Sequence, residues 1–117
     1  MTLIHQSAAR TALDDEIAAL VAECYADPLR YVRSMWPWRE PGPLEGYDGP
    51  DAWQTALLRD IGLEVQARRF DGHTPVLPLR FSVASAYGVG KTALAAWLVH
   101  WIFDTRPDSK GTVTANT

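Results

Sequence analysis

Residues 79–98 read LRFSVASAYGVGKTALAAWL, and this stretch carries the strongest structural signal in the chain. Its first part, residues 79–84, is short and rich in β-prone residues, which predicts a buried strand. From Leu94 onward, apolar residues recur at i, i+3, i+4 and i+7, the spacing of an amphipathic helix. Residues 111–115, GTVTA, predict a second strand. The order strand, glycine loop, helix, strand predicts a βαβ unit.

The loop between the first strand and the helix matches the phosphate-binding pattern G-x-x-x-x-G-K-[ST], except that Ser85 replaces the first glycine. In such a loop, backbone N–H groups and a helix N-terminus surround the phosphates of a nucleotide. We expect Lys91 to contact the β- and γ-phosphates and the Thr92 hydroxyl to bind Mg²⁺. The residues expected to contact the nucleotide here are Ser85, Ala86, Tyr87, Gly88, Val89, Gly90, Lys91 and Thr92.

A second interpretation of the same residues stays open. Residues 88–93 also satisfy G-x-G-x-x-A, a pattern typical of dinucleotide-binding Rossmann domains. That interpretation needs an acidic residue at the end of the second strand. Asp108 lies near the required distance but precedes the predicted strand.

Upstream of residue 79 the chain predicts helices and one long loop. Helical periodicity covers residues 13–24, and Asp27-Pro28 offers an N-cap and first-turn proline for a short helix that ends at Pro37. Prolines and glycines exclude regular structure over residues 37–50, whose aromatic residues we expect to pin the loop to the core. Residues 51–68 predict a third helix that opens with a capping box.

Composition narrows the possible functions. Eleven Lys and Arg against fourteen Asp and Glu give a net charge of −3, so no basic stripe for nucleic-acid binding is present. The single cysteine excludes an internal disulfide. The longest apolar run, residues 93–103, is too short to span a bilayer. We therefore expect a soluble, intracellular protein with no membrane contact.

The acidic residue that a P-loop hydrolase needs at the end of another strand is not found. Asp104 follows a hydrophobic run, but this run continues the helix that begins at Lys91, so Asp104 is expected to be a solvated helix-end residue. Gln54 has two interpretations. Its amide either caps the third helix or pairs with the edge of an adenine base.

On these motifs the chain resembles the large terminase subunit of tailed bacteriophages and prophages. The segments that carry the resemblance are residues 27–29, 36–38, 48–54, 83–94, 105–108 and 111–117. In that family an N-terminal P-loop ATPase drives double-stranded DNA into procapsids, and a C-terminal nuclease cuts the DNA. The resemblance implies ATP and Mg²⁺ as cofactors, Lys91 as a catalytic residue and Thr92 as the Mg²⁺ ligand. It also implies that Trp53 and Gln54 belong to an adenine-recognising segment, a role that could coexist with capping.

For the full-length protein, the resemblance implies ATP hydrolase activity in the cytoplasm of a bacterial host. The implied partners are double-stranded DNA, the portal protein, the small terminase subunit and further copies in a homo-oligomeric motor. Many relatives carry an arginine inside the P-loop, where this chain has Tyr87. The chain also stops before an acidic strand, so we expect it to be inactive alone. An inactive prophage remnant is an alternative, as is the Rossmann domain.

The expected fold is therefore α/β. It is a P-loop NTPase with three αβα layers and a parallel sheet, truncated after two core strands and preceded by N-terminal helices. Residues 1–50 would form a helical lead-in with a Pro/Gly-rich loop, and residues 51–117 would form the incomplete ATPase core. We expect Trp97 or Trp101 to be partly exposed where later strands would pack.

Overall fold

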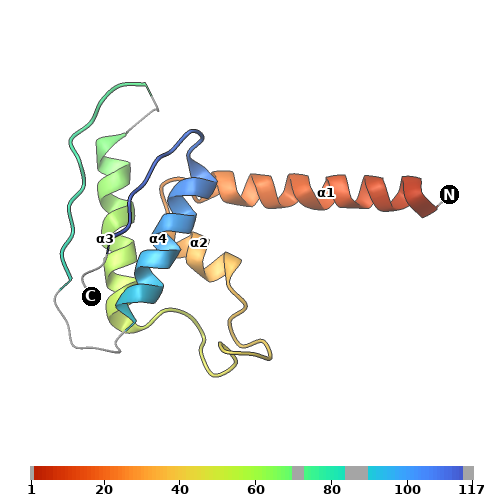
Figure 1. The fold of residues 1–117 in the computed structure, drawn as a ribbon, viewed down its shortest axis with the longest axis horizontal. Coiled ribbons are helices and arrows are strands. Elements are labelled where there is room, and N and C mark those ends of the chain that lie inside the picture. Colours follow the sequence, from red (N-terminus) through yellow and green to blue (C-terminus); the bar gives the residue numbers. More distant parts are fainter. Residues whose placement is uncertain (1, 70–72, 84–89, 115–117) are drawn as a thin grey trace.

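The fold is built on four helices within the residues that the computed structural model describes, which are 2–69, 73–83 and 90–114. The helices are α1 (Thr2–Glu23), α2 (Pro28–Met35), α3 (Ala52–Arg68) and α4 (Lys91–Thr105). Helix α2 packs against both α3 and α4 (Figure 1).

Helix α2 begins and ends where the local sequence signals place it. The Asp27 carboxylate accepts a hydrogen bond from the Arg30 backbone N–H at 3.0 Å, and Pro28 occupies the first helical position. This arrangement satisfies one of the N–H groups that a helix start leaves without an intrahelical partner. The helix stops at Met35, two residues before Pro37, because a proline disfavours helical backbone angles at the residue before it, which here is Trp36.

Helix α1 extends away from the other three helices, with the N-terminus at its far end (Figure 1). The radius of gyration is 16.8 Å, against roughly 13 Å for a compact domain of this length. Only the C-terminal part of α1 approaches the core, and Leu13 and Ile17 on the projecting part are 55% and 47% exposed. None of the helices in the described ranges has both the length and the hydrophobicity needed to cross a bilayer.

The predicted α/β fold is wrong for the part of the chain that the structure describes, which contains helices and no strand. Residues 79–83 and 111–114 form no regular secondary structure, and the remainder of the two predicted strands, residues 84 and 115, lies outside the described residues. A strand is defined by the backbone hydrogen bonds of a ladder, and a β-prone sequence does not create the ladder partner. Residues 73–83 instead run along α3 (Figure 1), where Arg68 Nε donates to the Leu77 carbonyl at 3.0 Å.

The expected exposure of Trp97 or Trp101 is also wrong. Trp97 is 7% exposed and Trp101 is 3% exposed. Trp36 and Trp38 cover Trp97 in edge-to-face contacts, with ring centroids 6.2 and 5.7 Å away. Aromatic residues from the segment after α2 therefore bury the face of α4 that we expected a sheet to cover.

Two polar contacts join α4 to the region before and within α2. The Trp101 Nε1–H donates to the Cys24 carbonyl at 2.7 Å, and the Tyr31 hydroxyl donates to the Asp104 carboxylate. Asp104 was expected to be a solvated residue at the helix end, and it also accepts this hydrogen bond from Tyr31.

The Arg106 guanidinium lies over the rings of Tyr25 and Trp101, at 4.0 and 4.5 Å from their centroids. These contacts satisfy buried polar groups and fix the crossing of the helices.

The burial of two leucines on α3 predicts that their substitution by alanine has different effects on the free energy of unfolding. Leu58 is fully buried, whereas Leu63 is 57% exposed. We expect Leu58→Ala to lower the free energy of unfolding by about 3 kcal/mol, because it removes buried methyl groups and leaves a cavity. Leu63→Ala is the matched control and should change it by less than about 0.5 kcal/mol. Urea unfolding monitored by circular dichroism measures both, and equal effects would contradict the packing described.

A second prediction concerns Tyr31, whose pKa is raised above its ordinary value of 10.0 by burial and by the hydrogen bond to Asp104. The unfolded chain ionises this tyrosine near pH 10 while the folded chain keeps it protonated, so its stabilising contribution is complete below pH 10 and declines at higher pH. Tyr31→Phe should cost about 1 kcal/mol at pH 8. Its difference from wild type should shrink as pH rises above 10. Urea unfolding at a series of pH values tests this, and a constant difference would argue against it.

Candidate functional site

The predicted phosphate site is centred on the start of α4. Gly90 is the N-cap residue, and the exposed Lys91 and Thr92 form the first turn. The predicted contacts of residues 85–89, which are Ser85, Ala86, Tyr87, Gly88 and Val89, lie outside the described residues. The prediction that a helix follows the glycine loop is confirmed, because α4 begins at Lys91.

Gln54 connects this helix start to the start of α3. Its side-chain Nε2 donates to the Gly90 carbonyl at 3.0 Å, and its Oε1 accepts from the Asp51 backbone N–H at 2.8 Å. Asp51 and Gln54 together form the predicted capping box. Gln54 is only 4% exposed, so these backbone partners compensate for burying its amide. The capping role of Gln54 is confirmed, and adenine recognition by Gln54 stays a prediction.

Gly90 has the backbone that the phosphate-binding pattern requires of a glycine. Its φ is +91°, a region that residues with a Cβ rarely adopt. A Cβ at this position would lie 2.5 Å from Gln54 Nε2 and 4.0 Å from the Trp53 ring. The half-buried Trp53 and the buried Gln54 thus border the residue that precedes Lys91.

A cavity of about 300 Å³ lies on one side of this junction, between the loop of residues 37–50 and the starts of α3 and α4. We call it the aromatic recess. Its lining residues are Trp38, Leu44, Tyr47, Gly49, Asp51, Gln54, Gly90, Ala93 and Trp97. Because Gly90 lines it, the aromatic recess adjoins the predicted phosphate site.

The loop of residues 37–50 is folded back on itself beside the recess. The Arg39 backbone N–H lies between two carbonyls, at 3.1 Å from that of Leu44 and 3.0 Å from that of Tyr47. The Arg39 side chain also forms an ion pair with Asp48. The hydrogen bond from Arg39 holds the pKa of the Asp48 carboxyl below its ordinary value. These contacts give an irregular loop a defined shape.

A second cavity, of about 330 Å³, lies between α3 and α4 on the other side of the α4 start. It is lined by Lys91 and by the apolar residues Leu57, Ile61, Phe81, Val83, Leu94, Ala95 and Leu98. Residues 81–83 thus cover apolar side chains of the two helices without joining a sheet.

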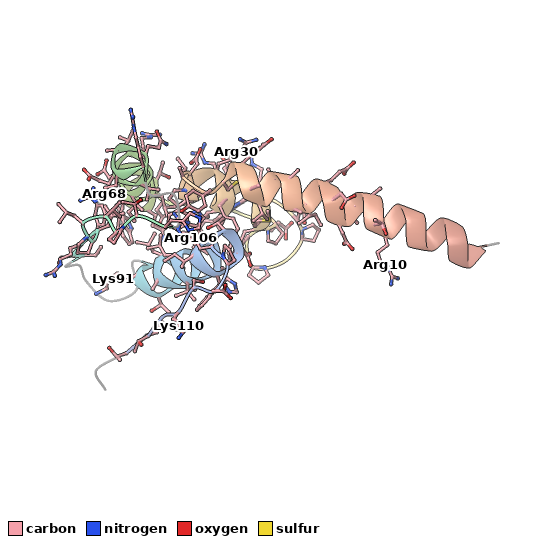
Figure 2. All side chains as sticks on the ribbon, turned by 90° about the horizontal axis from the view of Figure 1, so that it is seen from above. Arg10, Arg30, Arg68, Lys91, Arg106 and Lys110 are labelled. Carbon is pink, nitrogen blue, oxygen red and sulfur yellow. The ribbon has the colours of Figure 1, made fainter. Side chains whose placement is uncertain are left out.

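The electrostatics of the α4 start favour an anion. The positive end of the helix dipole lies there, and the backbone N–H groups of a first turn have no partner inside a helix. Gly90 has no side chain with which to cap them. Lys91, labelled in Figure 2, places a cation at the same end. Both the helix dipole and the lysine would attract a bound anion.

The described residues contain no group of three or more His, Cys, Asp or Glu side chains placed to hold a metal ion. The Thr92 hydroxyl is the predicted Mg²⁺ ligand, and it would bind the ion together with phosphate oxygens. Thr92 is exposed on the first turn of α4, which leaves it accessible to such a ligand.

Sequence reasoning missed the aromatic recess. The aromatic residues Trp38 and Tyr47 were expected only to pin the loop to the core, and Trp38 does so by donating from Nε1 to the Val32 carbonyl at 3.0 Å. Tyr47 is 54% exposed and borders the cavity. The one sequence signal that could have indicated a pocket was the clustering of aromatic residues in a long loop next to the glutamine segment.

Comparison of the chain with protein-family models, with curated proteins and with solved structures found no match.

Gly90→Ala tests the contact between α3 and α4. The new methyl group would collide with Gln54 Nε2 at a φ of +91°, so we expect the free energy of unfolding to fall by about 2 kcal/mol. Gly46→Ala is the matched control, because a Cβ at residue 46 meets no atom within 4 Å. Chemical denaturation of both variants provides the measurement. Equal stabilities would show that the junction does not depend on glycine.

Proposed function

We propose that this chain binds MgATP at the start of α4, as the N-terminal part of the ATPase motor of a phage terminase large subunit. In the full-length protein this binding would power the packaging of double-stranded DNA into procapsids. Lys91 would neutralise the β- and γ-phosphates, and Thr92 would bind the Mg²⁺ that bridges them. The proposal concerns these residues and does not depend on a parallel sheet.

The observation that carries the proposal is the hydrogen bond between Gln54 and Gly90. The two residues are 36 positions apart, and their contact brings the Trp53-Gln54 segment next to Lys91 and Thr92. The resemblance assigns the first segment to the base of ATP and the second to its phosphates. A nucleotide needs both ends of its site close together, which is the arrangement that this contact supports.

The charge at the α4 start adds a second line of support. Lys91 is the only charged side chain in the first turn of α4, whose next charged residue is Asp104 near the other end. A triphosphate bound here would place its negative charge at the positive end of the helix dipole and beside the Lys91 ammonium.

Lys91→Ala tests this role. We expect the affinity for MgATP to fall at least tenfold, because a cation facing the phosphates is lost. Isothermal titration calorimetry measures the affinity, and thermal unfolding of the unliganded variant checks that it keeps the wild-type fold.

Lys110→Ala is the matched control, because Lys110 is also exposed but follows α4 in the chain. It should bind MgATP like the wild type. If wild type fails to bind MgATP, or if Lys91→Ala binds it equally well, the proposed function is wrong.

A further inference from the structure

An apolar stripe on α1 continues from the core onto the part of the helix that projects into solvent (Figure 1). Helical spacing places Leu13, Ile17, Leu20 and Cys24 on one face of α1. Cys24 is fully buried and Leu20 packs against the core, whereas Ile17 and Leu13 are 47% and 55% exposed. The core therefore covers one end of the stripe and leaves the other end exposed to solvent.

A cavity of about 470 Å³ lies beside the exposed end of the stripe, between α1 and the end of α4. We call it the α1 groove. Its lining residues are Asp14, Ile17, Ala18, Val21, Ala22, Asp104 and Thr105. The α1 groove thus combines apolar side chains of α1 with one carboxylate from each of the two helices.

The stripe and the groove have acidic flanks. Asp14 and Asp104 line the groove, and both residues are exposed. Glu16 is also exposed, and helical spacing places it on the opposite flank of the stripe from Asp14. An apolar surface between carboxylates is complementary to an apolar surface that is flanked by cations.

The cations in this region do not cancel the negative charge. Residues 9–23 contain one basic residue, Arg10, and four acidic ones. Arg30 forms an ion pair with Glu23 at the far end of α1, and Arg106 is held over two aromatic rings. The exposed part of the stripe therefore keeps a negative surround.

This charge selects among the possible occupants of the groove. Two copies of α1 packed along their stripes would bring Asp14 and Glu16 of one copy close to the same residues of the other, which is unfavourable for like charges. Nucleic acid carries phosphates that the carboxylates repel. A basic protein segment is the occupant that the charge favours.

The shape of the surface favours a helix as that segment. Residues 13–21 span roughly 12 Å at the rise of an α-helix, which corresponds to about two turns of a partner helix. A helix that docks in a groove uses apolar anchors at i, i+3 or i+4, and i+7, which cover such a length.

We propose that the α1 groove, together with the exposed Leu13 and Ile17, binds a basic amphipathic helix of another protein. Apolar side chains of that helix would cover Ile17 and Val21, and its lysine or arginine side chains would face Asp14 and Asp104. This interaction surface is separate from the start of α4, and its use does not depend on nucleotide binding.

The test measures the binding of three synthetic peptides to the full chain by fluorescence anisotropy. The first peptide has leucines at helical spacing and lysines at the other positions. The second has glutamates in place of the lysines, and the third has the residues of the first in an order without helical spacing. The first peptide should bind at least tenfold more tightly than the other two.

Ile17→Ala tests the apolar part of the surface. It should weaken binding of the leucine–lysine peptide roughly tenfold, because it removes branched apolar surface that the peptide would bury. Alanine has the highest helix propensity, so α1 should stay helical. Leu63→Ala is the matched control, because Leu63 is exposed on α3 outside the groove, and it should bind the peptide like the wild type.

Asp14→Asn tests the electrostatic part. It should weaken binding of the leucine–lysine peptide roughly threefold and reduce the loss of affinity on addition of salt. Asp60→Asn, at an exposed carboxylate on α3, should leave both the affinity and its salt dependence unchanged. Circular dichroism and urea unfolding show whether each variant keeps the wild-type fold.

The inference is overturned if either of the other two peptides binds as tightly as the first, or if Ile17→Ala binds the first peptide like the wild type. It is also overturned if sedimentation shows a dimer of the chain that Ile17→Ala dissociates, since a second copy would then occupy the surface. Lys91→Ala should bind the peptide like the wild type, so a failure of MgATP binding and a failure of peptide binding are distinguishable.

Discussion

The arrangement of the site depends on the two hydrogen bonds of the buried Gln54 amide. It binds the Asp51 backbone at the start of α3 and the Gly90 carbonyl at the start of α4. A buried amide that lost either partner would carry a desolvation cost of about 1 to 3 kcal/mol. The two helix starts are therefore held at a fixed separation, and residue 90 has to be a glycine because Gln54 fills the space of a Cβ.

Along α4, tryptophan side chains provide the packing that we expected of a sheet. Trp36 and Trp38 cover Trp97, and Trp101 donates to the carbonyl of Cys24. Each indole brings a large apolar area together with an N–H group that can be satisfied by a nearby backbone carbonyl. The result is a helical core in the described residues, from which the N-terminal part of α1 projects (Figure 1).

Two properties of different origin meet at Gly90. The helix start and Lys91 provide positive potential, which is a local property of α4 and needs no other element. The aromatic recess requires a loop folded by the Arg39 contacts and a tryptophan from α4. A ligand that carries both a phosphate and an aromatic ring could contact the α4 start and the aromatic recess at the same time.

Local signals in the chain were sufficient for the starts of α2, α3 and α4, but not for α1, which begins at Thr2 where the periodicity predicted a helix over residues 13–24. Asp27-Pro28, the capping box from Asp51 and the Gly90-Lys91 step each act through neighbouring backbone groups, so the residues a few positions away contain the information. The predicted strands failed because a strand exists only through hydrogen bonds to a partner that β-propensity does not specify. The aromatic recess was missed for a related reason: Tyr47, Asp51 and Trp97 become one surface through long-range packing, and no sequence spacing encodes that proximity.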